Sequence, residues 1–213
     1  MGTIRHGANG GFSGKAGSII GSSWNNVSYI KGLHKISNKP ASQKQLDQRA
    51  RFAAVLGYLG PIKDVFTIGW KGQTGNRVSG FNMGIQYALG YAVVGDYPTY
   101  EVDKALIQIS KGSVQPYKSK AIASSTPGAL ELTWLPQIND LTAFSHDVLM
   151  AVVYNEDQNL FLLFKNVGKR VDAQATLEIP EDYSGQTIHV YLFYVNEAGT
   201  RQSNSSYIGP VTI

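Results

Sequence analysis

The hydrophobic periodicity of this chain changes once, near Gly95–Pro98, and this change constrains the fold more than any other feature. Before it, apolar residues recur at helical spacing; after it, they alternate along short segments, which is typical of strands. About eight such segments over ~100 residues, separated by turn residues, indicate a sandwich of antiparallel sheets. We therefore predict an α+β protein with two domains: residues 1–97 as an N-terminal β-hairpin plus helices, and residues 98–213 as an antiparallel β-sandwich.

Turn and capping residues mark the predicted elements. Ser42 and Gln45 form a capping box that predicts the start of a helix. Gly60–Pro61 ends this helix and starts a second one, and apolar spacing predicts a third over 80–93. The predicted strands of the second domain are 104–110, 117–123, 129–135, 146–155, 159–165, 171–179, 186–195 and 206–213.

The first 32 residues contain eight glycines, which lose more entropy on ordering than other residues. Within them, Ser18–Ile20 and Val27–Ile30 flank Asn25–Asn26, a plausible tight turn, and this pattern predicts a β-hairpin. A two-stranded element is marginal in water, so we expect the hairpin to pack on the following helices or on a partner. The apolar residues that we expect to anchor assembly are Phe12, Ile19, Ile20 and Trp24.

Charge is distributed unevenly along the chain. Residues 1–80 contain 11 Lys and Arg against 2 Asp and Glu, whereas residues 81–213 contain 8 against 13. Such an asymmetry bears on partners and association rather than on fold. The basic residues that we expect to contact an acidic partner surface or a polyanion are Lys15, Lys31, Lys35, Lys39, Lys44, Arg49 and Arg51.

No pattern in the sequence indicates catalysis. The absence of cysteine excludes disulfides, thiolate metal sites and thiol nucleophiles. The four histidines lack metal-ligand spacing, and Gly10–Ala16 lacks the register and the hydroxyl of a phosphate-binding loop. We therefore predict no catalytic, cofactor-binding or metal-binding residues. Without an apolar signal run or a membrane-length apolar stretch, we expect synthesis in the cytoplasm and no membrane span. Incorporation into an assembled particle is a separate expectation, which belongs to the favoured functional hypothesis below.

Two segments of the second half carry a family resemblance. Leu130–Trp134 is followed by Pro136, and His189–Asn196 is followed by Gly199 and a closing strand over 203–213. Over residues 103–213 this arrangement resembles a fibronectin type III-like module. The resemblance implies an immunoglobulin-like sandwich in which Trp134 and the tyrosine-bearing penultimate strand belong to the core.

The whole chain is also similar to an uncharacterised family of small bacterial proteins associated with phages and prophages. The similarity lies in a glycine-rich opening followed by a Gln…Arg-x-Arg-Phe helix, and it implies kinship without implying an activity. The segments that carry it are Gly10–Lys15, Gly21–Trp24, Lys39–Gln43, Gln48–Phe52 and Ile68–Gly72.

Two functional hypotheses follow. The favoured one is a non-enzymatic structural protein that assembles with itself or joins a larger, phage-like particle such as a virion, tail or filament. In it, the basic N-terminal part docks on an acidic partner surface. The alternative is an accessory protein that binds nucleic acid through phosphate contacts of the basic residues in 1–80. An enzyme is a distant third hypothesis, for which no substrate is suggested.

Overall fold

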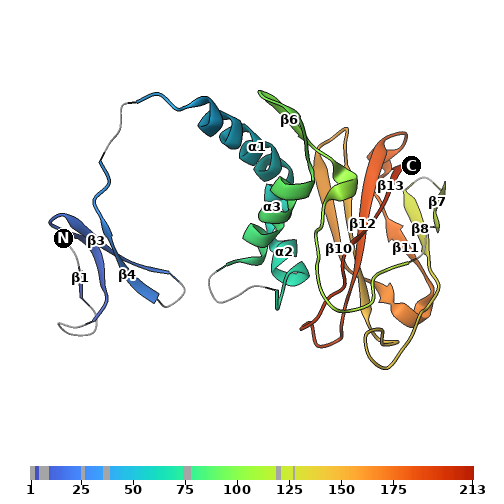
Figure 1. Cartoon of the computed structure of the whole chain (residues 1–213). Coiled ribbons are helices and arrows are strands. Elements are labelled where there is room, and N and C mark those ends of the chain that lie inside the picture. Colours follow the sequence, from blue (N-terminus) through green and yellow to red (C-terminus); the bar gives the residue numbers. More distant parts are fainter. Residues whose placement is uncertain are drawn as a thin grey trace. The chain divides into compact units, whose positions relative to one another are not determined.

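The computed structural model describes residues 3–4, 10–24, 27–35, 39–73, 78–118, 121–126 and 128–213. The chain divides into two compact units, residues 1–43 with 75–77 and residues 44–74 with 78–213 (Figure 1). The division therefore lies near residue 43 rather than at the expected boundary of 97. The reason is physical: the helices that follow residue 43 share a hydrophobic cluster with the C-terminal strands, so they belong to the same unit.

The first unit is a four-stranded antiparallel sheet with the strand order β1-β2-β3-β4. Pairing of β3 with β4, which begins at Trp24 opposite Val27, agrees with the predicted hairpin. The turn residues Asn25–Asn26 lie outside the described residues, and the two further strands were not predicted. The strands are β1 (Thr3–Ile4), β2 (Phe12–Ala16), β3 (Ile19–Trp24) and β4 (Val27–Gly32).

The second unit begins with helices. The first helix starts one residue after Ser42, where the capping pattern predicts it. Ser79 caps the last of them by accepting a hydrogen bond from the Asn82 backbone N–H at 3.3 Å, and this helix confirms the prediction over 80–93 although it ends two residues earlier. The helical elements are α1 (Gln43–Leu59), η1 (Gly60–Ile62), α2 (Lys63–Gly69) and α3 (Gly80–Tyr91).

The segment after α3 differs from the prediction. A hairpin of β5 (Val93–Asp96) and β6 (Thr99–Val102) stands where a helix end and a turn were expected. The predicted strand 104–110 is wrong, because a 3-10 turn, η2 (Lys104–Leu106), occupies its start. Asp103 nucleates this turn by accepting a hydrogen bond from the Ala105 N–H at 2.9 Å.

The remaining strands form two antiparallel sheets, one of four strands in the order β10-β9-β12-β13 and one of three in the order β11-β8-β7. Helices and antiparallel sheets in one chain confirm the α+β class. The strands are β7 (Ala121–Thr126), β8 (Ala129–Thr133), β9 (Val148–Asn155), β10 (Leu160–Lys169), β11 (Gln174–Glu178), β12 (Thr187–Val195) and β13 (Ser206–Thr212), with the 3-10 turns η3 (Arg170–Asp172) and η4 (Glu181–Tyr183).

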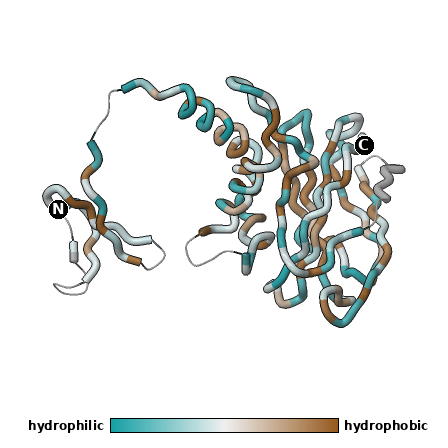
Figure 2. The backbone as a smooth tube through the Cα atoms, in the orientation of Figure 1, coloured by the Kyte–Doolittle hydropathy of each residue, from teal (hydrophilic) through white to brown (hydrophobic). Residues whose placement is uncertain are grey.

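The four-stranded sheet of the second unit, β10-β9-β12-β13, is covered on both faces. On one face, residues such as Val152 and Tyr191 pack against the helices through Leu59 and Phe66. On the other, residues such as Val153 and Val190 share a cluster with Leu130, Leu132 and Leu177 of the three-stranded sheet. Burial on both faces explains why β9 and β12 are almost continuously apolar (Figure 2).

One helical stretch, Gln43–Gly69, is long and apolar enough to cross a membrane by length and composition alone. The prediction of no membrane span is thus not confirmed by composition. The stretch is interrupted by Pro61 within η1, and its residues Val55, Leu59 and Phe66 are fully buried against the four-stranded sheet. Phe52 and Leu56 of the same stretch are exposed, so only part of it is covered by the sheet.

Candidate functional site

The first unit has almost no interior. Among its residues whose burial is described, only Gly21 is buried. Six large apolar residues of the unit remain exposed by 38–63% of their surface: Ile19, Trp24, Val27, Tyr29, Ile30 and Leu33. Because burial of apolar surface is the main force that stabilises a small fold, this sheet lacks the usual source of stability within itself.

The strand register assigns the residues of this sheet to two faces, since residues directly opposite each other in an antiparallel pair point to the same side. Lys15 lies opposite Ile20, which lies opposite Lys31. In β2, β3 and β4, the side that carries them, here called the basic face, consists of Ser13, Lys15, Ile20, Ser22, Trp24, Val27, Tyr29 and Lys31. The other side, here called the glycine face, consists of Phe12, Gly14, Ala16, Ile19, Gly21, Ser23, Ser28, Ile30 and Gly32.

The four predicted assembly anchors are divided between these faces. Phe12 and Ile19 lie on the glycine face, whereas Ile20 and Trp24 lie on the basic face. The Phe12 ring packs directly over Gly21, where an added Cβ would lie 2.6 Å from a ring carbon. Phe12 and Ile20 are half-buried, and Ile19 and Trp24 are exposed. The anchors therefore do not form a single cluster.

The seven predicted basic contacts are likewise divided, in this case between the two units. Lys15 and Lys31 lie on the basic face, and Lys35 and Lys39 follow β4 in exposed positions. The other three lie on α1 of the second unit: Lys44, Arg49 and Arg51.

Of these α1 residues, Arg51 has neighbours within its own unit. Its guanidinium lies 5.1 Å from the centre of the Tyr100 ring, and the Tyr100 hydroxyl donates a hydrogen bond to Asp47. That hydrogen bond raises the pKa of the Tyr100 hydroxyl. Lys44 and Arg49 are exposed on the same helix, whereas Arg51 is half-buried. Lys44 and Arg49 are therefore more accessible to a partner than Arg51.

The two units differ sharply in charge. Residues 1–43 with 75–77 contain six Lys and Arg and no Asp or Glu, whereas the second unit contains 13 Lys and Arg against 15 Asp and Glu. The first unit is therefore purely cationic at neutral pH. A surface of this kind attracts anionic partners and steers their approach.

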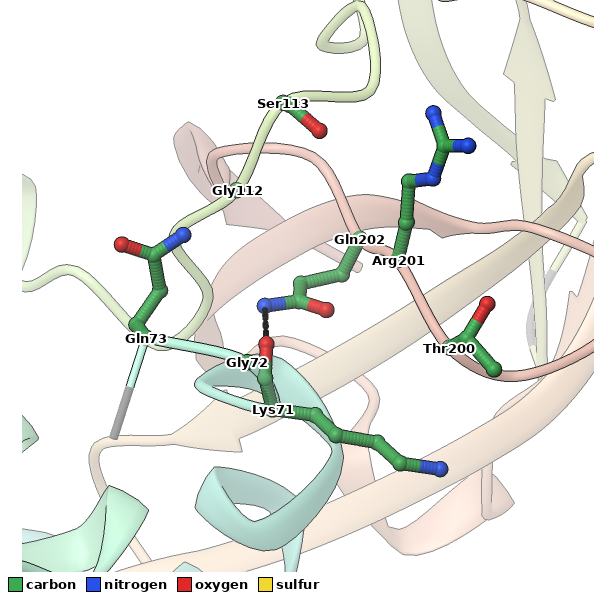
Figure 3. Close-up of a pocket in the computed structure, with 8 residues that line it drawn as sticks. All are labelled: Lys71, Gly72, Gln73, Gly112, Ser113, Thr200, Arg201 and Gln202. Atoms are coloured by element: carbon green, nitrogen blue, oxygen red, sulfur yellow. Dashed lines mark hydrogen bonds between the residues drawn. The ribbon is translucent and has the colours of Figure 1, made fainter. Parts of the chain in front are cut away.

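A polar pocket of about 170 Å³ lies in the second unit (Figure 3). The amide nitrogen of the buried Gln202 donates to the Lys71 carbonyl at 2.6 Å and to the Lys111 carbonyl at 2.8 Å, and Lys71 Nζ donates to the Gly199 carbonyl at 2.7 Å. Figure 3 shows the Lys71 and Arg201 side chains pointing in different directions. The hydrogen bonds that line the pocket therefore connect the end of α2 to the loops between strands. The Lys71 and Arg201 side chains do not point toward a common ligand position. Its lining is Lys71, Gly72, Gln73, Gly112, Ser113, Thr200, Arg201 and Gln202.

Sequence reasoning missed a chain of polar contacts on the helix-covered side of the sheet. Glu156 bonds Lys104 and, at 3.1 Å, His189 Nε2, while His189 Nδ1 lies 2.7 Å from the Tyr207 hydroxyl. The hydrogen bonds from Lys104 and His189 hold the pKa of Glu156 below its usual value. No local signal could have found this group, because its members come from four separate elements or loops. Its donors and acceptors satisfy one another, as in a structural network.

A buried ion pair lies on the other side of that sheet. Asp147 Oδ2 is 3.2 Å from Arg170 Nη2, and both side chains are almost completely buried. The Arg170 guanidinium also stacks 3.8 Å over the Tyr194 ring, and Trp134 Nε1 donates to the Arg170 carbonyl at 2.9 Å. Trp134 is thus a core residue, as predicted. His146, by contrast, is exposed.

Metal-binding chemistry finds no support in the part of the chain that the structure describes, where no three His, Asp or Glu side chains gather as a metal site would require. The described chemistry of the N-terminal sheet is instead that of a contact surface. Exposed apolar and aromatic side chains stand beside lysines, on a sheet with open edges.

Comparisons with known proteins name no activity for the chain. Residues 11–209 match the protein-family model described as Family of unknown function (DUF6266). None of the curated proteins matches the chain. Among solved structures, the solution structure of the fibronectin type III domain of the human collagen alpha-1(XX) chain is similar at 16% sequence identity, with a TM-score of 0.35, over 47% of this chain and 87% of that domain. A TM-score of this size carries no argument about fold or function.

Proposed function

Because the chain belongs to the Family of unknown function (DUF6266), we propose its function from its own surfaces: a non-enzymatic structural protein that assembles with itself or into a larger particle. The N-terminal sheet is the contact element of this proposal. One observation carries it, namely that Gly21 is the only buried residue of that sheet among those whose burial is described.

The physical argument is one of missing burial. Fully burying an aliphatic or aromatic side chain contributes about 1.5–3 kcal/mol. Trp24, Tyr29 and Ile30 keep 55%, 43% and 63% of their surface exposed, so much of this stabilisation is unused within the sheet. A partner that covers these residues would supply it. Trp24 and Tyr29 lie on the basic face and Ile30 on the glycine face, and contiguous exposed apolar surface is typical of interaction sites.

Charge supports an acidic surface as the partner of the first unit. That unit carries six cations and no acids, and the second unit of another copy carries an excess of acids. Contact between unlike surfaces of successive copies is heterologous, so it builds rings or open filaments. The resemblance of the N-terminal segments to phage-associated proteins favours a phage-like virion, tail or filament as the particle.

The second unit would serve as a rigid module in such an assembly. We propose that its strands 121–213 form an immunoglobulin-like or fibronectin III-like sandwich. Support comes from the cluster that the three-stranded and four-stranded sheets share and from the buried Trp134 after β8. A module of this type presents surfaces and exposed edges to partners without any need for catalytic groups.

Light scattering of the full chain over a range of protein and salt concentrations tests the proposal. We expect concentration-dependent oligomers that weaken when Trp24 and Ile30 are both changed to Ser. Leu141→Ser is the matched control, because Leu141 is 79% exposed but lies in the second unit. A chain that stays monomeric at high concentration in both low and high salt contradicts the proposal.

A specific observation also favours the alternative function. The register places Trp24 and Tyr29 on the same face as Lys15 and Lys31, and single-stranded nucleic acid binds where aromatic platforms adjoin cations. A mobility-shift assay with a single-stranded oligonucleotide tests this, since each phosphate contact adds about 0.7 to the salt slope. Absence of binding at ~50 mM salt would remove the alternative.

A further inference from the structure

The outer edge of β4 in the first unit is open. β4 is the last strand in the order β1-β2-β3-β4, so no strand of the described residues pairs with its outer side (Figure 1). Its pairing with β3 is regular from Trp24–Val27 to Ile19–Gly32, without a bulge, and the strand contains no proline. Natural sheets usually protect an open edge with charged side chains, a bulge, a proline or a covering element. Within the described residues of the first unit, the β4 edge has only the charge of Lys31.

The hydrogen-bond pattern of the hairpin fixes which groups face outward. The Leu33 N–H donates to the Ser18 carbonyl at 2.9 Å, so these two residues form a hydrogen-bonded pair. Such pairs alternate with non-bonded ones along an antiparallel ladder. The residues of the non-bonded pairs in β4 therefore turn their backbone N–H and C=O groups away from β3, and they are Ser28, Ile30 and Gly32.

We propose that β4 pairs antiparallel with β4 of a second copy about a two-fold axis at Ile30, which joins the two four-stranded sheets into one. Ile30 then lies opposite Ile30 of the second copy, and Ser28 lies opposite Gly32. This inference rests on the proposed function of self-assembly and deepens it by naming the partner, the strand and the register. A contact of this kind is isologous and closes as a dimer.

The register follows from the side chains. Centring the axis at Ile30 lets all three outward-facing residues take part in hydrogen-bonded pairs. It also places Tyr29 opposite Lys31 of the second copy, twice, so that each lysine meets an aromatic ring. A shift of the axis to Lys31 would oppose the two lysines directly, which is unfavourable. A shift to Tyr29 would leave Gly32 outside the ladder.

Charge gives this contact a signature of its own. The first unit carries six cations and no acids, so two such units repel each other, and added salt screens that repulsion. Pairing through β4 should therefore persist or strengthen as salt increases. The heterologous contact between a basic and an acidic surface should weaken under the same conditions.

Cysteine cross-linking of the full chain tests the register, because the natural sequence contains no cysteine. Opposite residues of a hydrogen-bonded pair have Cα atoms about 5.5 Å apart, within the range of about 4.4–6.8 Å that a disulfide spans. We expect Ile30→Cys to form a disulfide-linked dimer on mild oxidation, at undiminished yield in high salt. Ser28→Cys alone is the matched control, since Ser28 and its copy would lie about 13 Å apart along the strands.

A mixture of Ser28→Cys and Gly32→Cys chains provides a second, independent arm. An added Cβ at Gly32 meets no atom within 4 Å, so this substitution fits the sheet. We expect the mixture to cross-link although neither chain does so alone. Oligomers in light scattering without the Ile30→Cys dimer, or equal cross-linking of all three variants, would overturn the β4 contact and leave self-assembly standing. A monomer under every condition would overturn both.

Discussion

Replacing Arg170 by methionine should destabilise the second unit by about 3–5 kcal/mol, the usual cost of breaking a buried ion pair by removing one partner. The Arg170 side chain is 3% exposed and the Asp147 side chain is fully buried. Methionine retains much of the apolar stem of arginine, but it removes the contact with Asp147 Oδ2 and the 2.9 Å hydrogen bond to the Gln115 carbonyl.

The magnitude follows from what remains around the carboxylate. After the change, Asp147 Oδ2 keeps the Phe144 N–H at 2.9 Å, while Asp147 Oδ1 has no hydrogen-bond partner among the described residues. A charge left in this state carries its desolvation penalty without compensation. Adding Asp147→Asn removes the charge and keeps an acceptor for the Phe144 N–H. The double variant should therefore be more stable than Arg170→Met alone.

Urea unfolding followed by tryptophan fluorescence measures both effects. With a slope of about 2 kcal/mol per molar urea, the single variant should lower the midpoint by about 1.5–2.5 M. Lys165→Met is the control, because Lys165 is an exposed residue of the neighbouring β10 and surface changes usually stay within about 0.5 kcal/mol. A loss below about 1 kcal/mol for Arg170→Met, or a double variant no better than the single, would refute this reasoning.

Three further predictions concern the second unit. In α3, Gly84→Ala should destabilise the folded unit by about 1–3 kcal/mol, because the added Cβ would lie 2.1 Å from the Phe66 ring. Gly90→Ala should instead stabilise it by up to about 1 kcal/mol, because the added Cβ meets no atom within 4 Å. Similar shifts of the melting temperature for both variants would contradict this. The folded state lowers the pKa of Glu156, so its contribution to stability is complete above the unfolded value of about 4.3 and is lost as pH falls below it; Glu156→Gln should show a flatter loss of stability in acid. Tyr191→Phe should cost more stability in chemical denaturation than the ~1 kcal/mol of Tyr58→Phe, because the Tyr191 hydroxyl bonds both Tyr58 at 2.9 Å and the Lys104 carbonyl at 2.8 Å.

Local sequence signals located several elements well. Ser42 predicted the start of α1, and alternation or apolar runs predicted the strands around Leu132, Val152 and Leu192. These features depend on neighbours within a few residues, where capping, periodicity and turn chemistry act directly. The core position of Trp134 was implied by the fibronectin III-like resemblance rather than by a local signal, and Trp134 is buried. The functional hypotheses remain predictions.

Other features depended on contacts far apart in sequence. The division near residue 43 arises because α1 packs on strands more than 90 residues away, as in the 2.9 Å contact of Tyr58 with Tyr191. The network around Glu156 and His189 likewise joins separate elements. The hydrophobic periodicity of a segment predicts its secondary structure but not which distant segment it packs against.

The amino-acid order was sufficient for the class of most segments and for the cationic character of the first 43 residues, because propensity and charge are properties of the residues themselves. It could not tell which side chains share a face. A shift of one residue in strand register moves every side chain to the opposite side, so only the paired sheet decided that Trp24, Tyr29 and Lys31 stand together and that Ile30 lies on the other face.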